Sequence, residues 1–284
     1  MTDPTQSVLV LGGTGKTGSR VTEKLAAGGV RCLTAARTGA AVRFDWDDPT
    51  TYGPALVGVD RIYLVTPYLG TREFADRISR FLDMAADRAV RHVTYLSAHG
   101  IDQAPPEIPY RAAELDLMGR EAFTHSILRP AWFNQNFSEG FLSPVDDVFA
   151  LPAGNGLEAF VDVEDVASVA AATLADPDAH AAAQYTPTGP EAMTFSDAAD
   201  IMAGVANRPI TYHDVDRETW VRESIAAGLP ADYASIMRLV TDDIASGRGT
   251  QPNDVVQTVT GVPPISFREY ATRTKHAWMP TGNR

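Results

Sequence analysis

The sequence predicts an α/β protein in which a doubly wound, parallel sheet is combined with a smaller, mainly helical C-terminal lobe. Over residues 1–130, short apolar runs alternate with segments of helical periodicity. This alternation is typical of parallel strands that are joined by right-handed helical crossovers. After Pro130 the rhythm changes: residues 131–160 are rich in aromatic residues, glycine and proline, and short helical patterns predominate from Phe195 onward.

Each expected element follows from the local spacing of apolar residues. Apolar runs predict strands at residues 7–11, 31–36, 41–44, 60–65, 91–97, 126–129 and 209–213. Helical spacing predicts helices at residues 16–27, 72–87, 111–119 and 162–174. We therefore expect a core of residues 1–130 with 161–176 and 208–214, and a smaller lobe of residues 131–160, 177–207 and 215–284.

The composition argues against several classes of function. The 284 residues carry a formal net charge of −12, which disfavours nucleic acid or an anionic membrane surface as a partner. The single cysteine, Cys32, can form no internal disulfide. The first residues, MTDPTQS, lack the basic and apolar regions of a secretory signal, and no apolar run approaches the ~18 residues of a membrane span. We expect a cytoplasmic protein that binds a small molecule, with monomer and homodimer both open.

The stretch VLVLGGTGKTGSRV, residues 8–21, contains two overlapping phosphate-binding signatures. A P-loop ending in Gly15-Lys16-Thr17 requires a glycine where the chain has Val10, so the loop is too short for that motif. The spacing G-x-G-x-x-G is satisfied, and a strand precedes it while a helix follows it. We therefore expect a Rossmann-type dinucleotide site formed by Gly12, Gly13, Thr14, Gly15, Lys16, Thr17 and Gly18.

The end of the second strand indicates which dinucleotide binds. NAD sites usually carry an acidic residue about 20 positions after the glycines, but this strand ends TAARTG, with Arg37 and no acid beside it. Arginine there can bind a 2′-phosphate, which favours NADP(H). The remaining expected contacts lie near the adenine or at the ends of later strands: Asp45, Trp46, Thr66, Pro67, Ser97 and Pro130.

The chain resembles the NmrA-like, atypical branch of the short-chain dehydrogenase/reductase superfamily over nearly its whole length. The resemblance is carried by the ordered succession of LVLGGTGKTG, FDWDDP, YLVTPY, VTYLSAHG, SILRPAWFNQNFSEGF, AFVDVEDVA and YTPTGPEAMTFSDAA, followed by TDDIASG and VTG. Within that branch it is similar to ergot-alkaloid-type reductases, of the agroclavine and festuclavine dehydrogenase kind, and then to NAD(P)H:quinone reductases. The resemblance implies a Rossmann core, an NADP(H) cofactor and a substrate cleft between core and lobe.

The candidate catalytic residues are Ser97 and Tyr110, which have nearly the spacing of serine and tyrosine in typical short-chain dehydrogenases. In those enzymes a lysine four positions after the tyrosine lowers its pKa, but here that position is Glu114. A carboxylate would act on a phenol in the opposite direction. An acceptor that needs mainly hydride delivery would not require the tyrosine–lysine pair, because water can supply a proton.

The segment after Pro130 is expected to form the substrate wall beside the nicotinamide, because ligands of α/β folds bind at the carboxyl ends of the strands. Its candidate contacts are Trp132, Phe133, Asn134, Asn136 and Phe137, with His99 and Phe141 as further candidates. The alternative interpretation is an aromatic staple between the lobes. The histidines show no metal-ligand spacing, so no metal is expected.

These observations predict an NADPH-dependent reductase that transfers hydride to a hydrophobic, aromatic or polycyclic small molecule of the quinone, enone or imine type, for example in secondary metabolism. Two alternatives stay open at this point. One is a non-catalytic, NADP(H)-binding redox sensor or regulator. The other is a protein of the same fold with non-redox cyclase or isomerase activity.

Overall fold

The computed structural model describes residues 7–66, 72–88 and 90–279. The chain separates into two compact units. Unit 1 contains the described residues of 1–130, 163–187 and 258–261, and unit 2 contains those of 131–162, 188–257 and 262–284.

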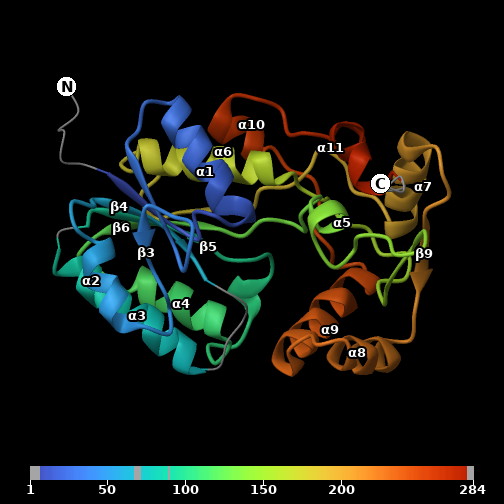
Figure 1. Cartoon of the computed structure of the whole chain (residues 1–284), viewed down its shortest axis with the longest axis horizontal. Helices are drawn as coiled ribbons and strands as arrows, with labels where there is room; N and C mark the ends of the chain where they lie inside the picture. The colour runs from blue at the N-terminus through green and yellow to red at the C-terminus, as the bar shows by residue number, and fades with distance from the viewer. Residues whose placement is uncertain (1–6, 67–71, 89, 280–284) are drawn as a thin grey trace. The chain divides into compact units, whose positions relative to one another are not determined.

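Unit 1 is built on a seven-stranded parallel sheet with the order β3-β2-β1-β4-β5-β6-β8 (Figure 1). The order runs outward in both directions from β1 and β4, so the sheet is doubly wound and the predicted fold class is confirmed. The strands are β1 (Val8–Leu11), β2 (Cys32–Ala36), β3 (Val42–Arg43), β4 (Arg61–Val65), β5 (His92–Leu96), β6 (Thr124–Leu128) and β8 (Ala183–Tyr185).

Helices cover both faces of this sheet. In Figure 1, α1 (Lys16–Ala27) and α6 (Val163–Ala175) lie on one face, and α2 (Tyr52–Ala55), α3 (Arg72–Ala86) and α4 (Pro109–Met118) lie on the other. Two short 3₁₀ helices, η1 (Pro49–Thr51) and η2 (Ile101–Gln103), lie in connections that follow β3 and β5. The apolar face predicted for α3 packs into the core, since Phe74, Ile78, Phe81 and Leu82 are all buried.

Unit 2 is mainly helical and has a two-stranded parallel sheet of its own, in which β7 (Val148–Leu151) pairs with β9 (Thr211–Asp214). Its helices are α5 (Asn136–Glu139), α7 (Phe195–Ala206), α8 (Arg217–Ala226), α9 (Ala231–Ala245), α11 (Phe267–Thr274) and the 3₁₀ helix η3 (Lys275–Trp278). Helix α10 (Val255–Thr260) contributes residues to both units. An aromatic cluster fills the core of unit 2, where Phe137 meets Phe149, Phe160 and Phe267 edge to face.

The structure differs from the predicted organisation in two places. The strand expected at 209–213 is β9, which pairs with β7 in unit 2, so residues 208–214 do not join the core sheet. Conversely, β8 lies within the segment assigned to the lobe but extends the core sheet beside β6. The sequence of β8 is only Ala-Gln-Tyr, and its side chains are partly or fully exposed, so it has no apolar alternation to reveal it.

None of the helices in the described part of the chain is both long enough and apolar enough to cross a membrane.

Candidate active site

The glycine loop between β1 and α1 is packed so tightly that its glycines have no room for side chains. Gly12 has a φ of +62°, and a Cβ on it would lie 2.8 Å from Cγ1 of Val65. A Cβ on Gly13 would lie 2.7 Å from Cβ of Thr34, and one on Gly18 would overlap the carbonyl oxygen of Gly12. The loop is therefore a cradle of bare backbone, as close approach of a diphosphate requires.

The N-terminus of α1 is shaped for an anion. Gly15 caps the helix in an extended conformation, and no side chain accepts a hydrogen bond from the first turn. The amide N–H of Gly15 donates to the carbonyl of Gly12 over 2.8 Å, which closes the turn into the helix. Thr17 is buried, and its contact with the cofactor stays a prediction. The N–H groups of the first turn, which no side chain caps, and the positive end of the helix dipole fit a pyrophosphate.

Arg37 follows the carboxyl end of β2 and is solvent-exposed. Within residues 7–66, 72–88 and 90–279 it makes no ion pair. The turn that carries it lies beside the glycine loop, because a Cβ on Gly39 would be 3.7 Å from Cγ2 of Thr14. The guanidinium is thus available to a phosphate on an adenosine ribose held by that loop.

The residues expected near the adenine divide into two kinds. Trp46 is 9% exposed and its ring packs edge to face on Phe44, at 4.9 Å between centroids, so most of the ring belongs to the core. Asp45 accepts a hydrogen bond at Oδ1 from the backbone N–H of Asp47 and keeps its other oxygen near Arg43. Asp45 therefore keeps acceptor capacity, whereas little of the Trp46 ring is accessible.

The later cofactor positions follow the ends of β4, β5 and β6. Thr66 is buried directly after β4, and Pro67 lies outside the described residues. The carbonyl of Pro130 accepts from the backbone N–H of His99 over 3.3 Å, which joins the segments after β5 and β6. His99 itself is exposed.

Glu114, which stands at the position of the lysine of typical short-chain dehydrogenases, is the centre of a buried charge network. Glu114 on α4 is fully buried and accepts from Nε and Nη2 of Arg129, each over 2.8 Å. Nη1 of Arg111 donates to the same carboxylate over 2.8 Å, and Oγ of Ser97 donates over 2.6 Å. Arg129 also donates from Nη1 to the amide oxygen of Gln184 over 2.8 Å. The network ties the ends of β5, β6 and β8 to α4.

The network determines what the candidate catalytic residues can do. Burial disfavours the charged guanidinium of Arg129, but the hydrogen bonds and charge of Glu114 outweigh burial and raise the pKa of Arg129. The hydroxyl of Ser97 donates a hydrogen bond to Glu114, so its one proton is engaged within the network, and its catalytic role stays a prediction. Tyr110 is half-buried, and its ring lies 6.3 Å from that of Tyr95, between centroids.

The expected substrate wall lies in unit 2. Trp132 is half-buried and contacts Phe141 and Phe195 edge to face, with ring centroids 5.9 and 5.7 Å apart. Phe133 is half-buried and forms an isolated bridge to Val161. These two rings keep part of their surface accessible, and Phe141 is 46% exposed.

Phe137 was expected to contact the substrate, and this expectation is wrong. Its side chain is fully buried in the aromatic core of unit 2, where its centroid lies 5.3 Å from that of Phe160. The preceding residue, Asn136, is half-buried at the start of α5. The sequence could not show that Phe133 is half-buried and Phe137 fully buried, because both stand in the same aromatic run.

Asn134 is the most unusual side chain of this segment. It is fully buried, and neither its Nδ2 nor its Oδ1 has a hydrogen-bond partner among the residues that the structure describes. Its backbone is satisfied, since its N–H donates to the carbonyl of Val161 over 2.9 Å. A buried amide without partners costs several kcal/mol at most sites, and such exceptions call for an explanation.

The sequence analysis missed Glu158, whose carboxylate holds the backbone of Trp132 in the expected substrate wall. Its carboxylate is 1% exposed and accepts from the backbone N–H of Trp132 over 3.2 Å and from that of Thr250 over 2.9 Å. The hydroxyl of Thr250 donates to the same group. No local pattern marks Glu158, because its partners lie 26 and 92 positions away.

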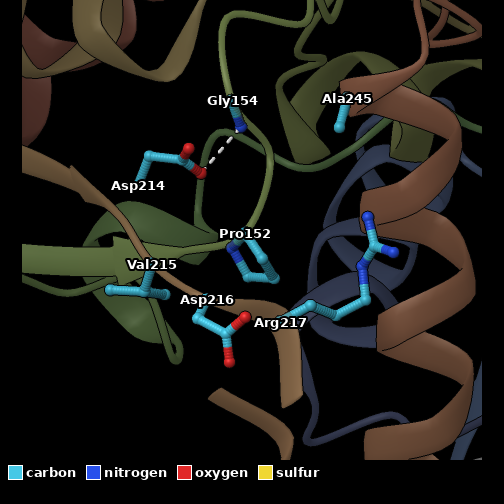
Figure 2. A pocket seen from close by; sticks show the side chains of 7 residues that line it. All are labelled: Pro152, Gly154, Asp214, Val215, Asp216, Arg217 and Ala245. Carbon is cyan, nitrogen blue, oxygen red and sulfur yellow. Dashed lines mark hydrogen bonds between the residues drawn. The ribbon is translucent and has the colours of Figure 1, made fainter. Parts of the chain in front are cut away.

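A separate cavity of about 300 Å³ lies within unit 2 and contains none of the predicted site residues (Figure 2). Asp214 lines it and accepts at Oδ1 from the backbone N–H of Gly154 over 2.9 Å. The side chain of Arg217 extends past the cavity and pairs with Asp242. The described residues contain no cluster of histidine, cysteine or carboxylate side chains that would hold a metal ion.

The doubly wound sheet and the bare glycine cradle define a Rossmann-type dinucleotide-binding protein. No protein-family model matches the chain. Among the relatives that do match are an uncharacterised oxidoreductase of Bacillus subtilis, 31% identical over 95% of this chain and 96% of its own, and festuclavine dehydrogenase of Aspergillus fumigatus, 30% identical over 96% and 99%. The chain belongs to their family of oxidoreductases, the NmrA-like, atypical branch of the short-chain dehydrogenase/reductase superfamily.

A solved structure has the same fold. The triphenylmethane reductase of Citrobacter sp., crystallised with NADP(H), superposes with a TM-score of 0.77 at 22% identity, over 94% of this chain and 99% of the reductase. This likeness extends over both units of the chain.

Proposed function

We propose that the protein is an NADPH-dependent reductase that transfers hydride to a hydrophobic, aromatic or polycyclic small molecule of the quinone, enone or imine type. The observation that carries the proposal is the glycine cradle with an exposed Arg37 beside it, which makes no ion pair among the described residues, and no acidic residue at the same strand end. The relatives that are named oxidoreductase and dehydrogenase support a redox role, and the reductase crystallised with NADP(H) supports the cofactor.

The residues of this chain fit the cofactor at three points. The backbone of Gly12, Gly13 and Gly15 with the first turn of α1 would hold the pyrophosphate, and Arg37 would bind the 2′-phosphate. The carboxylate of Asp45 would accept from the adenine amino group. Thr14, Lys16, Gly18, Thr66 and Pro130 complete the proposed set on unit 1.

When bound, the reduced nicotinamide supplies a hydride. The protein's own contribution is positioning, because the residue that would tune Tyr110 is a carboxylate committed to Arg129 and Arg111. On unit 2, the half-buried rings of Trp132 and Phe133 would stack on a flat apolar ligand, and Asn136 offers a polar contact. On unit 1, the exposed His99 is a further candidate for a polar contact. The partnerless amide of Asn134 could bind a ligand carbonyl or ring nitrogen after a local shift.

The proposal is tested by incubating the protein and NADPH with a panel of quinones, enones and imines while following the absorption band of the reduced nicotinamide. Oxidation of NADPH that depends on both acceptor and protein is the expected result. Tight NADPH binding without turnover on any acceptor would contradict the reductase and favour a redox sensor. Conversion of a substrate without net oxidation of NADPH would favour the cyclase or isomerase alternative.

Cofactor preference gives a first prediction. Arg37→Ala should weaken NADPH binding by about 10- to 150-fold, the equivalent of one charge-assisted hydrogen bond of roughly 1.5–3 kcal/mol. Its affinity for NADH should change little, because NADH lacks the 2′-phosphate. Titration by nicotinamide fluorescence measures both constants. The control is Arg268→Ala, which removes an exposed arginine from α11; equal losses for both cofactors in Arg37→Ala would contradict the assignment.

Tyr110 gives a second prediction. Tyr110→Phe should lower the maximal rate by less than about 10-fold, whereas loss of a general acid costs about 10²–10⁴-fold. The reason is that Glu114 stands at the lysine position and is already fully engaged. Steady-state rates at saturating NADPH provide the measurement. A fall of 10²-fold or more with unchanged cofactor affinity would show that the phenol donates a proton.

A further inference from the structure

The two side chains that correspond to the proton-transfer pair of typical short-chain dehydrogenases are poorly placed to give up a proton. The hydroxyl of Ser97 donates to Glu114 over 2.6 Å. Tyr110 has no lysine one helical turn away, and the carboxylate at that position is held by Arg111 and Arg129. A proton for the reduced acceptor therefore has to come from water or from another side chain at the same edge of the sheet.

His99 lies at this edge and its backbone is fixed on both sides. It follows the end of β5, at the carboxyl ends of the parallel strands, where ligands of doubly wound sheets bind. Its N–H donates to the carbonyl of Pro130 over 3.3 Å. The turn that follows is closed by the N–H of Ile101, which donates to the carbonyl of Ala98 over 3.3 Å. Gly100 within this turn has a φ of +78°, a conformation that favours glycine.

The imidazole of His99 is available to a ligand. His99 is exposed, and its ring makes no hydrogen bond or ion pair with any residue that the structure describes. Histidine is the side chain whose ordinary titration falls between pH 5 and 8, which is why it is the commonest general acid of enzymes. His99 therefore combines a fixed backbone with a ring that can carry and release a proton near neutral pH.

A carboxylate near His99 supplies a counter-charge. Asp102 lies on η2, and its Oδ2 accepts from Nε2 of Gln103 over 2.7 Å. Partial burial opposes the ionisation of Asp102, but the hydrogen bond from Gln103 and the positive charges of Arg129 and His99 lower its pKa. The attraction between Asp102 and the imidazolium of His99 is mutual. The charge of Arg129 is balanced by Glu114, which pairs with it over 2.8 Å.

We propose that His99 is a catalytic residue of the reductase, the general acid that protonates an acceptor which becomes an anion on reduction. The inference rests on the proposed function. Hydride adds to carbon of a conjugated carbonyl acceptor, and the displaced π electrons shift to the carbonyl oxygen. The N–H bond of the imidazolium breaks, its proton passes to that oxygen, and the electron pair stays on the neutral ring. The exposed ring then takes a new proton from solvent.

Acceptors with and without a proton requirement test this role. Menadione and 2-cyclohexen-1-one become anions after hydride addition, whereas N-methyl-3,4-dihydroisoquinolinium becomes a neutral amine and needs no proton. Loss of a general acid costs about 10²–10⁴-fold, so His99→Ala should lower the maximal rate with the first two acceptors at least 100-fold more than with the third. The matched control is His276→Ala, at an exposed histidine on η3, which should leave all three rates unchanged.

The pH profile separates proton donation from packing. The wild-type rate with menadione should fall as the pH rises, because the imidazolium loses its proton, and His99→Ala should lack this fall. Asp102→Asn should move the fall to lower pH, since the imidazolium loses its counter-charge. Imidazole added to His99→Ala should restore part of the rate, which a purely structural side chain would not allow.

Binding without turnover gives an independent measurement. In the presence of saturating NADP⁺, 4-nitrophenolate resembles the oxyanion that receives the proton, and its neutral methyl ether, 4-nitroanisole, does not. A charge-assisted hydrogen bond corresponds to about 10- to 150-fold in affinity, so the phenolate should bind at least 10-fold more tightly than the ether. His99→Ala should remove this difference and leave the affinity for the ether unchanged.

Several results would overturn the inference. Equal losses with all three acceptors in His99→Ala, an unchanged pH profile, or a phenolate preference that survives the substitution would each do so. A wild-type protein that reduces the iminium but neither carbonyl acceptor would also refute it, because such a protein supplies no proton, and this outcome would leave the reductase standing. NADPH that is stable to every acceptor would refute the reductase itself.

Discussion

Arg129→Met lowers the free energy of unfolding by about 3–5 kcal/mol, as expected when one member of a buried ion pair is removed. Glu114 has no solvent exposure, and Arg129 provides two of its four hydrogen bonds. The variant leaves the carboxylate with Arg111 and Ser97 only, in a place where water cannot replace the lost donors. Urea unfolding followed by circular dichroism measures the loss.

A double variant separates the ion pair from simple packing. Glu114→Leu combined with Arg129→Met removes both charges and should recover much of the stability that Arg129→Met loses, because no unpaired carboxylate remains. The matched control is Glu269→Gln, which breaks the exposed pair with Arg273 on α11 and should cost less than about 1 kcal/mol. If Arg129→Met loses no more unfolding free energy than Glu269→Gln does, the network contributes little to stability. The same conclusion follows if the double variant is less stable than Arg129→Met.

Acid sensitivity that depends on His92 is the second large effect. His92 on β5 is fully buried, and its ring contacts the hydroxyls of Thr124, Thr94 and Ser126. Burial lowers the pKa of His92 to about 4 from its ordinary value of 6.5, with nearby positive charges adding to the effect. The unfolded chain therefore binds a proton between pH 6.5 and 4 that the folded chain does not, so stability is lost as the pH falls.

The expected size of this loss is about 3 kcal/mol at pH 4, since each pH unit between the two pKa values corresponds to about 1.4 kcal/mol. His92→Gln removes the titrating ring. Between pH 7 and pH 4, the variant should therefore lose about 3 kcal/mol less unfolding free energy than the wild type loses. Urea unfolding at each pH measures the difference. The control is His276→Gln, at a solvent-exposed position. If His92→Gln and the wild type lose the same stability on acidification, the imidazole of His92 takes up its proton at the same pH in the folded and the unfolded state.

The elements that position the cofactor loop could be predicted from the sequence because their signals are local. The helix expected at 16–27 has the bounds of α1, and the expected strands β1, β2, β4 and β5 shift by only one residue at either end. Apolar runs followed by glycines, and helical spacing after them, depend on nearest neighbours alone. The short strands β7 and β8 were missed because their sequences are brief and their pairing partners are distant.

The charge network of the site could not be predicted because its partners are distant in sequence. In the sequence Glu114 stands out only as a departure from the lysine of related enzymes, and no local pattern pairs it with Arg129, which lies 15 positions away. The interpretation of the segment after Pro130 was wrong at Phe137, since an aromatic run does not show which rings turn inward. Burial of Trp46 has the same cause: it depends on rings from α3 that lie 28 and more positions away.

The crowding of the glycine loop has a practical consequence for directed evolution of cofactor preference. Any side chain at Gly12 or Gly18 collides with neighbouring atoms, so random libraries at these positions should yield mostly inactive clones. The turn after β2 is different, since Arg37 is exposed and only Gly39, with a φ of +71°, has a conformational reason to stay glycine. In the proposed site, holding the cofactor and choosing between its phosphorylated and unphosphorylated forms are thus separate tasks on separate segments. A library confined to residues 37, 38 and 40 would search the choice alone and leave the fold untouched.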